Sequence, residues 1–300
     1  MINYLSVTEA AKKLGVSERS VRSYCADGKI HGAVRKGKTW QLPENAQKPE
    51  RINKRAETPK TLADVLKKEK AVRLSGGIYH KIQIDLTYNS NHIEGSCLTH
   101  DQTRYIFETN TISVHEGAMK VDDIMETANH FKCIDMVIDS LSYAPNEAFI
   151  KQLHAVLKGG TSDSRLDWFA VGEYKKFPNE VGGKETTQPD HVACEMRKLL
   201  TEYNAISEKS FDDLLEFHYR FESIHPFQDG NGRIGRLLLF KECLRHNIVP
   251  FIISDDLKIY YYRGLREWRN EKGYLRDTCL TAQDRFKKVL DYFRIEYPDK

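Results

Sequence analysis

The chain has 300 residues, of which 40% are hydrophobic and 30% charged, the balance of a globular protein rather than a disordered or fibrous one. It has no apolar run of the roughly 20 residues that cross a bilayer, and its start lacks a secretory pattern, so we expect a cytoplasmic protein without a membrane partner. Six cysteines, spread singly with no C-x-x-C pair, argue against a zinc ribbon, a redox dithiol or a disulfide scaffold.

The charge is divided unevenly along the chain. Residues 1–60 hold 13 Lys and Arg against 6 Asp and Glu, whereas the remaining 240 residues hold 33 against 37. A basic end on a mildly acidic body predicts two modules with different partners. A solvated basic arm without a partner is the alternative.

Residues 1–46 are predicted to form a helix-turn-helix module. Thr8 is placed to cap a helix over residues 9–14, Gly15 breaks that helix, and Ser17 starts a second one that runs to about residue 26. Residues 31–42 then alternate loosely around a basic turn, which predicts a β-wing. The segment resembles the small helix-turn-helix domains of the excisionase and MerR type.

That resemblance implies that the second helix enters the major groove of DNA while the wing lies on phosphates. The candidate DNA contacts are the basic side chains of these two segments, Arg19, Arg22, Lys36 and Lys38. A helical pair that only docks on another protein would have a similar pattern.

Residues 47–60 are polar, basic and interrupted by Pro49 and Pro59, which predicts a linker. From residue 61 to residue 300 apolar side chains recur at spacings of three and four, so we expect a mainly α domain. The expected helices cover 61–73, 77–88, 99–109, 125–141, 146–157, 192–203, 211–224, 233–247, 260–270 and a last one near 282–293. Within 172–189, Gly182-Gly183 between two short extended pieces predicts a β-hairpin.

One segment, His-Pro-Phe-Gln-Asp-Gly-Asn-Gly-Arg-Ile-Gly-Arg over residues 225–236, has the composition of a phosphate-binding loop. It joins an amphipathic helix to an apolar one, and its glycines permit a tight turn. Loop amides at a helix N-terminus, with Arg233 and Arg236 three residues apart, suit an anionic phosphate. Asp229 is a hard ligand for Mg²⁺ shared with phosphates, and His225 can accept a proton near neutral pH.

These residues match the signature of the Fic family, H-P-F-x-[DE]-G-N-G-R-x-x-R, and the resemblance covers roughly residues 75–295. It implies a helical Fic fold and transfer of AMP from ATP to a Ser, Thr or Tyr hydroxyl of a target protein. By the same resemblance His225 is the general base and Asp229 holds Mg²⁺ or Mn²⁺. The implied ATP-binding residues of the loop are Gly230, Asn231, Gly232, Arg233, Gly235 and Arg236.

Two further segments are similar to parts of Fic proteins. The predicted hairpin resembles the flap that holds the target segment by strand-like pairing, with contacts at Asn179, Glu180, Val181 and Gly182. The family usually has Arg where this chain has Lys175. A second stretch resembles the helix that walls the adenine pocket, which implies roles for Tyr261, Tyr262 and Asn270. Core packing is the alternative for a Tyr pair at a helix start.

Residues 90–95, Ser-Asn-His-Ile-Glu-Gly, match the inhibitory motif of the family, [ST]-x-x-x-E-[GN]. Ser90 and Glu94 are four apart and share one helical face. The resemblance implies that Glu94 pairs with Arg236 and takes the space of the γ-phosphate. An ordinary helix end with a surface Glu is the alternative.

The sequence as a whole predicts an autoinhibited protein adenylyltransferase with an N-terminal helix-turn-helix domain. The expected partners are ATP, a protein substrate and, through residues 1–46, DNA; a second copy of the chain is a further candidate. One alternative is a de-AMPylating or bifunctional enzyme that uses Glu94. Another is a DNA-binding regulator whose Fic body binds nucleotide without turnover. A metal hydrolase is disfavoured because the histidines lack a ligand spacing such as H-E-x-x-H.

Overall fold

The computed structural model describes residues 3–49, 61–113 and 118–298, which fall into two compact units, Met1–Thr58 and Pro59–Lys300. Each unit has a hydrophobic core of its own. Most of the linker expected at 47–60 lies outside the described residues. Within the described ranges, no helix combines the length and the apolar composition that a bilayer crossing requires.

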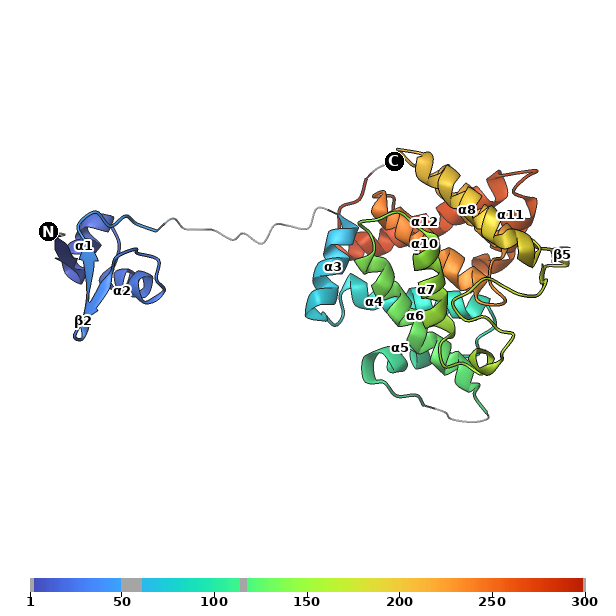
Figure 1. The fold of residues 1–300 in the computed structure, drawn as a ribbon, viewed down its shortest axis with the longest axis horizontal. Helices are drawn as coiled ribbons and strands as arrows, with labels where there is room; N and C mark the ends of the chain where they lie inside the picture. The colour runs from blue at the N-terminus through green and yellow to red at the C-terminus, as the bar shows by residue number, and fades with distance from the viewer. Residues whose placement is uncertain (1–2, 50–60, 114–117, 299–300) are drawn as a thin grey trace. The chain divides into compact units, whose positions relative to one another are not determined.

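The N-terminal unit pairs two helices with a small antiparallel sheet (Figure 1). Its elements are β1 (Tyr4–Ser6), α1 (Val7–Leu14), α2 (Glu18–Ala26), β2 (Val34–Lys36) and β3 (Thr39–Pro43). β3 lies between β1 and β2, so β2 and β3 form the expected wing. Side chains of both helices and of β3 meet in the core, including Val7, Ala10, Val21 and Leu42. The helix-turn-helix prediction is confirmed.

The first helix starts earlier than predicted. Ser6, not Thr8, is the N-cap of α1: its hydroxyl accepts from the Glu9 N–H, and the Glu9 carboxylate accepts from the Ser6 N–H at 2.8 Å. This reciprocal capping box satisfies two otherwise unpaired donors. Thr8 instead donates its hydroxyl to Glu18 at 2.8 Å, which ties α1 to α2.

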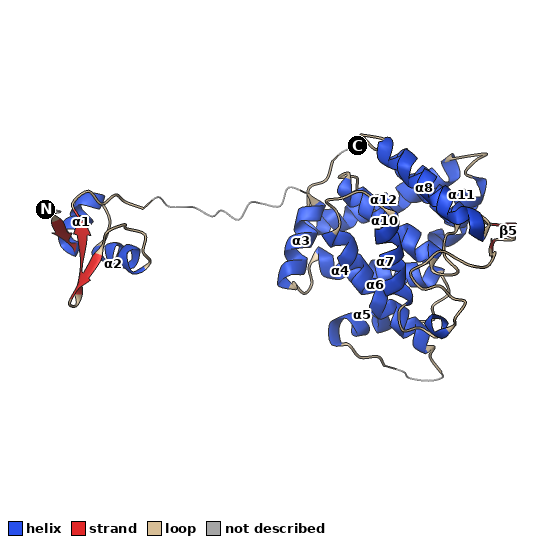
Figure 2. Cartoon of the chain, in the orientation of Figure 1, coloured by secondary structure: helices blue, strands red, loops and turns tan. Residues whose placement is uncertain are grey.

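The second unit is almost entirely helical (Figure 2). Its helices are α3 (Leu62–Val72), α4 (Ile78–Ile93), α5 (His100–Thr109), α6 (Val121–Asp139), α7 (Glu147–Lys158), α8 (Pro189–Ala205), α9 (Phe211–Ile224), α10 (Asn231–Arg245), α11 (Lys258–Glu267) and α12 (Gly273–Phe293). The described residues of this unit also include two short 3₁₀ helices, Asp163–Arg165 and Asp255–Leu257, and the hairpin β4 (Glu180–Val181) and β5 (Lys184–Glu185). The mainly α prediction is confirmed.

Helix α10 is the centre of this unit. Nearly all of its side chains are buried, including the charged Arg233, Arg236, Lys241 and Glu242, and α3, α4, α6, α7 and α9 contact it. A helix that is buried on every face is stable only when it is surrounded by others. Its N-terminal turn, which follows the 225–230 loop, is therefore held rigidly among helices from distant parts of the chain.

Candidate active site

Residues 225–230 form a closed loop that leads from α9 into α10, and residues 231–236 form the first turns of α10. His225 ends α9 in a left-handed conformation (φ 51°), and Gly230 adopts the same region (φ 80°) just before α10. Asn231 closes the loop, because its Oδ1 accepts from the Phe227 N–H at 2.8 Å and its Nδ2 donates to the Phe227 carbonyl at 2.8 Å. Both backbone groups of a buried residue are thereby satisfied.

His154 of α7 packs against the loop and stabilises it. Its ring stacks on Phe227 with centroids 4.0 Å apart. Its Nδ1 accepts from the Gly172 N–H at 2.8 Å, so its Nε2 bears the proton and donates to the Asp229 carbonyl at 3.1 Å. Burial lowers the pKa of His154 to about 4, which keeps this neutral tautomer in place at neutral pH.

His225 is held with one ring nitrogen available. Its Nδ1 donates to the Glu222 carbonyl at 3.4 Å, which leaves Nε2 unprotonated in the neutral ring. Burial, together with the Lys175 ammonium, lowers the pKa of His225 to about 4. The imidazole is therefore neutral at pH 7 and presents a lone pair.

A cluster of charges surrounds the Asp229 carboxylate. Lys158 Nζ donates to Asp229 Oδ2 at 2.7 Å, and Arg233 donates to the same oxygen at 3.3 Å. Glu126 of α6 accepts from both Lys158 and Arg233. Partial desolvation would raise the pKa of Asp229, but the two cations outweigh it and lower that pKa to about 2. The carboxylate is ionised and its side chain is half exposed.

Arg236 and the motif at 90–95 meet at the first turns of α10. Arg236 donates through Nε to the Ser90 hydroxyl at 3.1 Å and through one guanidinium nitrogen to the Ser90 carbonyl at 2.8 Å. The same nitrogen donates to Glu94 Oε1 at 2.7 Å. The Glu94 carboxylate also lies directly against Gly232, at the position that a Cβ of residue 232 would occupy. The predicted spacing of Ser90 and Glu94 thus brings both onto one guanidinium.

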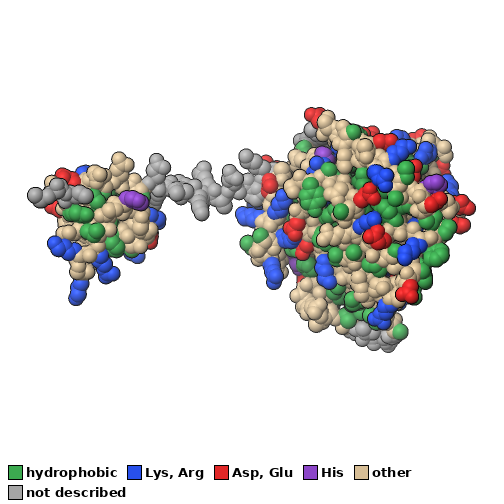
Figure 3. Space-filling view, viewed as in Figure 1, with side chains coloured by type: hydrophobic (Ala, Val, Ile, Leu, Met, Phe, Trp, Pro, Cys, Tyr) green, Lys and Arg blue, Asp and Glu red, His purple; other side chains and the backbone are tan. Residues whose placement is uncertain are grey.

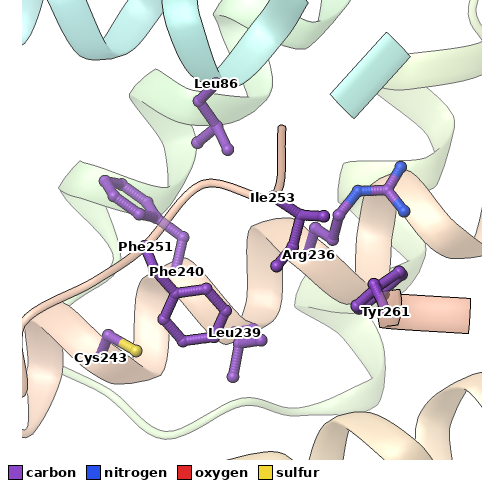
Figure 4. Close-up of a pocket in the computed structure, with 8 residues that line it drawn as sticks. All are labelled: Leu86, Arg236, Leu239, Phe240, Cys243, Phe251, Ile253 and Tyr261. Atoms are coloured by element: carbon purple, nitrogen blue, oxygen red, sulfur yellow. The ribbon is translucent and has the colours of Figure 1, made fainter. Parts of the chain in front are cut away.

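An apolar cavity lies behind Arg236 (Figure 4). The guanidinium points away from Phe240 and Cys243, and the cavity has room for about one water molecule. Tyr261 closes one side: it is buried, and its hydroxyl lies 2.6 Å from His218 Nε2. Tyr262 is 39% exposed and is the one of the two tyrosines with surface to offer a ligand.

The carboxyl of Glu222 lies close to these groups. Its Oε1 is buried against Gly235 and has no hydrogen-bond partner among the described residues. Burial raises the pKa of Glu222 to about 8, although the Arg236 charge opposes the rise. A side chain at position 235 would displace the Glu222 carboxyl from this place.

The β4–β5 hairpin is joined to the loop. The Lys175 N–H donates to the Pro226 carbonyl at 2.8 Å, and Asn179 Nδ2 donates to the Phe227 carbonyl at 3.0 Å. Lys175 Nζ is bonded to Asn179 Oδ1 and to Thr186 Oγ1, each at 2.6 Å, and burial lowers its pKa to about 8. Beyond Asn179 the hairpin is mainly exposed, including the predicted flap residues Glu180, Val181 and Gly182.

The remaining predicted site residues lie on exposed surface. Asn270 follows α11 and donates to Glu267 at 3.3 Å, and no hydrogen bond among the described residues connects its side chain to the loop. In the N-terminal unit Arg19, Arg22, Lys36 and Lys38 are exposed, and Arg22 is paired with Glu18 at 2.8 Å. Lys and Arg side chains gather at the wing end of this unit (Figure 3).

Residues 144–242 match the Fic/DOC family, and residues 4–46 match a helix-turn-helix domain family. The chain contains a Fic/DOC family domain. Both matches agree with the resemblances seen in the sequence, and the Fic match includes the whole loop and the hairpin.

Curated relatives are similar over most of the Fic unit. The protein adenylyltransferase Fic of Drosophila willistoni is 30% identical over 216 residues, which are 69% of this chain and 40% of the relative. That of Drosophila melanogaster is 29% identical over 217 residues, 69% of this chain and 41% of the relative. The chain thus spans about two fifths of the length of these relatives.

Solved structures share the fold. A Fic domain containing signaling protein from Bacteroides thetaiotaomicron covers 79% of this chain and 99% of its own at a TM-score of 0.62 and 23% identity. Fic-1 from C. elegans covers 77% and 71%, at a TM-score of 0.59 and 18% identity. At these identities the likeness concerns the fold of the Fic unit.

The side chains of the Fic site that could bind a divalent metal are few. The described residues include no group of three or more His, Cys, Asp or Glu side chains placed to hold a metal alone. Asp229 offers an ionised, half-exposed carboxylate beside a helix N-terminus. Mg²⁺ commonly takes one or two protein carboxylates and completes its shell with water and substrate phosphates. The donor set fits a metal bound jointly with phosphates and not a protein cage.

Three residues of the Fic site had no signal in the sequence. Glu126, His154 and Lys158 contact the loop directly, yet each lies more than 60 residues before it. These three residues support the loop. The loop and the first turns of α10 present the neutral imidazole of His225, the ionised carboxylate of Asp229 and two guanidinium groups around one helix N-terminus. Such an arrangement can bind a phosphate chain and accept a proton from an attacking hydroxyl.

Proposed function

We propose that this chain is an autoinhibited protein adenylyltransferase that transfers AMP from ATP to a Ser, Thr or Tyr hydroxyl of a target protein. The observation that carries the proposal is the convergence of His225, Asp229, Arg233 and Arg236 on the first turns of α10, with Glu94 bonded to Arg236. The named activity of the Drosophila relatives supports it.

In the proposed reaction the target hydroxyl oxygen attacks the α-phosphorus of ATP. A new P–O bond forms, the bond from the α-phosphorus to the bridging oxygen breaks, and pyrophosphate leaves. The hydroxyl proton passes to Nε2 of His225, the nitrogen left free by the Nδ1 bond to Glu222. Positioning and charge neutralisation supply most of the rate in such transfers, and a placed base adds about 10²–10⁴-fold.

The other groups bind and align the triphosphate. Backbone N–H groups of the first turn of α10, from Gly230 to Gly232, would donate hydrogen bonds to the α-phosphate oxygens, since helix N-termini bind anions. Arg233 and Arg236 would neutralise the β- and γ-phosphates, and Tyr262, with Tyr261 behind it, would border the nucleoside. A divalent metal bound to Asp229 would add charge neutralisation at the phosphates. The exposed strand β4 would pair with the target segment.

Glu94 is the proposed brake. It accepts a hydrogen bond from Arg236 and lies against Gly232, so it competes with the γ-phosphate for the same guanidinium. Charge-assisted bonds of this kind are among the strongest in proteins. ATP would then bind, if at all, with its α-phosphorus out of line with the attacking hydroxyl.

A second candidate is removal of AMP from a modified target, with Glu94 orienting a water. The Glu94 carboxylate is 30% exposed and faces the loop, which permits that role. Release of AMP by the unaltered protein, and not by a Glu94→Gly form, would support it. Binding of DNA by residues 1–46, a homodimer and a cytoplasmic location stay predictions.

The donor chemistry can be tested with the position of the label. The Glu94→Gly form would be incubated with a cell lysate and either α-labelled or γ-labelled ATP. Protein labelled only from α-labelled ATP is the expected result. Label from γ-labelled ATP would indicate phosphate transfer instead, and nucleotide binding without any label would favour a regulator without turnover.

A further inference from the structure

Lys158 is a buried cation at the end of α7 that no motif in the sequence marks. Its side chain is 3% exposed, and Nζ bonds to Asp229 at 2.7 Å, to Asp163 at 3.0 Å and to Glu126. These carboxylates come from three separate segments: the loop, a short 3₁₀ helix and α6. An ammonium ion is buried at this depth only when opposite charges surround it.

The cluster also includes Arg233, which shares Glu126 with Lys158. Three carboxylates therefore face two cations, which leaves one net negative charge beside the proposed phosphate site. Without Lys158, three carboxylates would face a single guanidinium. Such a group would attract divalent cations and repel a triphosphate.

We propose that Lys158 is a resident cation of the phosphate site: it neutralises Glu126, Asp163 and Asp229 so that they do not capture a divalent metal by themselves, and the metal enters together with ATP. The inference rests on the proposed function for the binding of ATP at this loop. Lys158 acts through Asp229 and is a positioning residue. Both cations bond to Oδ2 of Asp229, and among the described residues Oδ1 has no ion pair, which leaves it for the metal.

The test measures binding in place of turnover. Mn²⁺ binding without nucleotide would be followed by electron paramagnetic resonance. ATP binding in excess EDTA would be followed by calorimetry in the Glu94→Gly background. Lys158→Met is expected to bind Mn²⁺ at least about tenfold more tightly and ATP at least about tenfold more weakly. Lys158→Arg should match the parent protein.

Two controls separate this role from a structural one. Lys151→Met removes a lysine from the same helix, paired with Glu173 at 2.6 Å outside the cluster, and should change neither affinity. Asp163→Asn alters a carboxylate that is 38% exposed, so it should fold even if Lys158→Met does not. It shifts the charge in the opposite direction and should weaken Mn²⁺ binding and strengthen ATP binding.

Unchanged or reversed Mn²⁺ affinities in Lys158→Met and Asp163→Asn would overturn the proposal. If no variant binds ATP, even with Glu94→Gly and Mg²⁺ present, the proposed function fails, whereas the Mn²⁺ measurements still decide the role of Lys158. The two ideas therefore fail in different experiments.

Discussion

Glu94 Oε1 lies 2.7 Å from a guanidinium nitrogen of Arg236, although the two residues are 142 positions apart in the chain. Ser90, one helical turn before Glu94, bonds to the same guanidinium through both its hydroxyl and its carbonyl. Ser90 and Glu94 of the motif at 90–95 thus both bind one arginine of α10. The γ-phosphate of ATP would have to displace the Glu94 carboxylate and not the Ser90 contacts.

Removing the Glu94 carboxylate should release Arg236 for ATP. A hydrogen bond between charged groups contributes about 1.5–3 kcal/mol, so Glu94→Gly should raise self-labelling with ATP and Mg²⁺ by roughly 10- to 100-fold. Label per protein over time would be measured by autoradiography. Glu94→Gln, which keeps the shape and loses the charge, should give an intermediate rate. Equal labelling of all three proteins would show that Glu94 is not a brake.

Asn231 should be the main stabiliser of the loop. Asn231→Ala leaves the buried Phe227 N–H without a partner and removes one of the two hydrogen bonds to the Phe227 carbonyl, which keeps its bond from Asn179. An orphaned buried donor costs about 1–3 kcal/mol and a lost hydrogen bond about 0.5–1.5 kcal/mol. We expect the free energy of unfolding, measured in urea, to fall by about 2–4 kcal/mol. A loss below about 0.5 kcal/mol, typical of surface changes, would mean that the loop is fixed by other contacts.

The buried carboxyl of Glu222 should make the folded protein less stable as pH rises from about 5 to 8. Burial raises its pKa from 4.5 to about 8, so the folded protein keeps a proton that the unfolded chain releases. The stability from this group is complete below pH 4.5 and is lost as pH rises through 8. Glu222→Gln should therefore gain stability relative to the unaltered protein as pH goes from 5 to 8, by more than about 1 kcal/mol.

The check is thermal unfolding of both proteins across that pH range. A stability difference that does not change with pH would show that Glu222 is ionised in the folded state. Burial lowers the pKa values of His130 and His218 to about 3, so these histidines destabilise the folded protein at acid pH. Both proteins contain them, so this effect cancels in the stability difference.

The wing should contribute to DNA binding through phosphates. Lys36 and Lys38 are exposed on the β2–β3 hairpin, and each phosphate contact adds about 0.9 to the slope of log affinity against log salt. Lys36→Ala/Lys38→Ala should lower that slope by about 2, as measured by fluorescence anisotropy with duplex DNA. Lys48→Ala, exposed and outside the wing, is the control. If the affinity for DNA depends neither on Lys36 and Lys38 nor on the salt concentration, the wing does not bind DNA phosphates.

Much of this arrangement follows from local sequence. Gly182-Gly183 predicted the hairpin because only glycine adopts the left-handed conformation there readily, and both glycines have it. The four-residue spacing of Ser90 and Glu94 placed them on one face. The predicted cap of α1 is wrong because Thr8 and Ser6 both have a side chain that can cap a helix, and only Ser6 has a Glu three residues later.

The support of the loop could not be predicted in this way. Lys158 and His154 are 71 and 75 residues from Asp229, and only the packing of α7 against α10 brings them to it. A lysine at a helix end and a histidine on an apolar face are common and carry no local signal. Likewise α12 begins at Gly273 and not near residue 282, because Leu275 and Cys279 extend the apolar period beyond the predicted start.

The role of His225 decides between an enzyme and a nucleotide-binding regulator. Glu94→Gly and Glu94→Gly/His225→Ala would be compared in α-labelled ATP with Mg²⁺, with ATP binding measured in parallel. Loss of the base should slow labelling by about 10²-fold or more while ATP binds with similar affinity. Equal labelling rates in the two proteins would contradict transfer through His225.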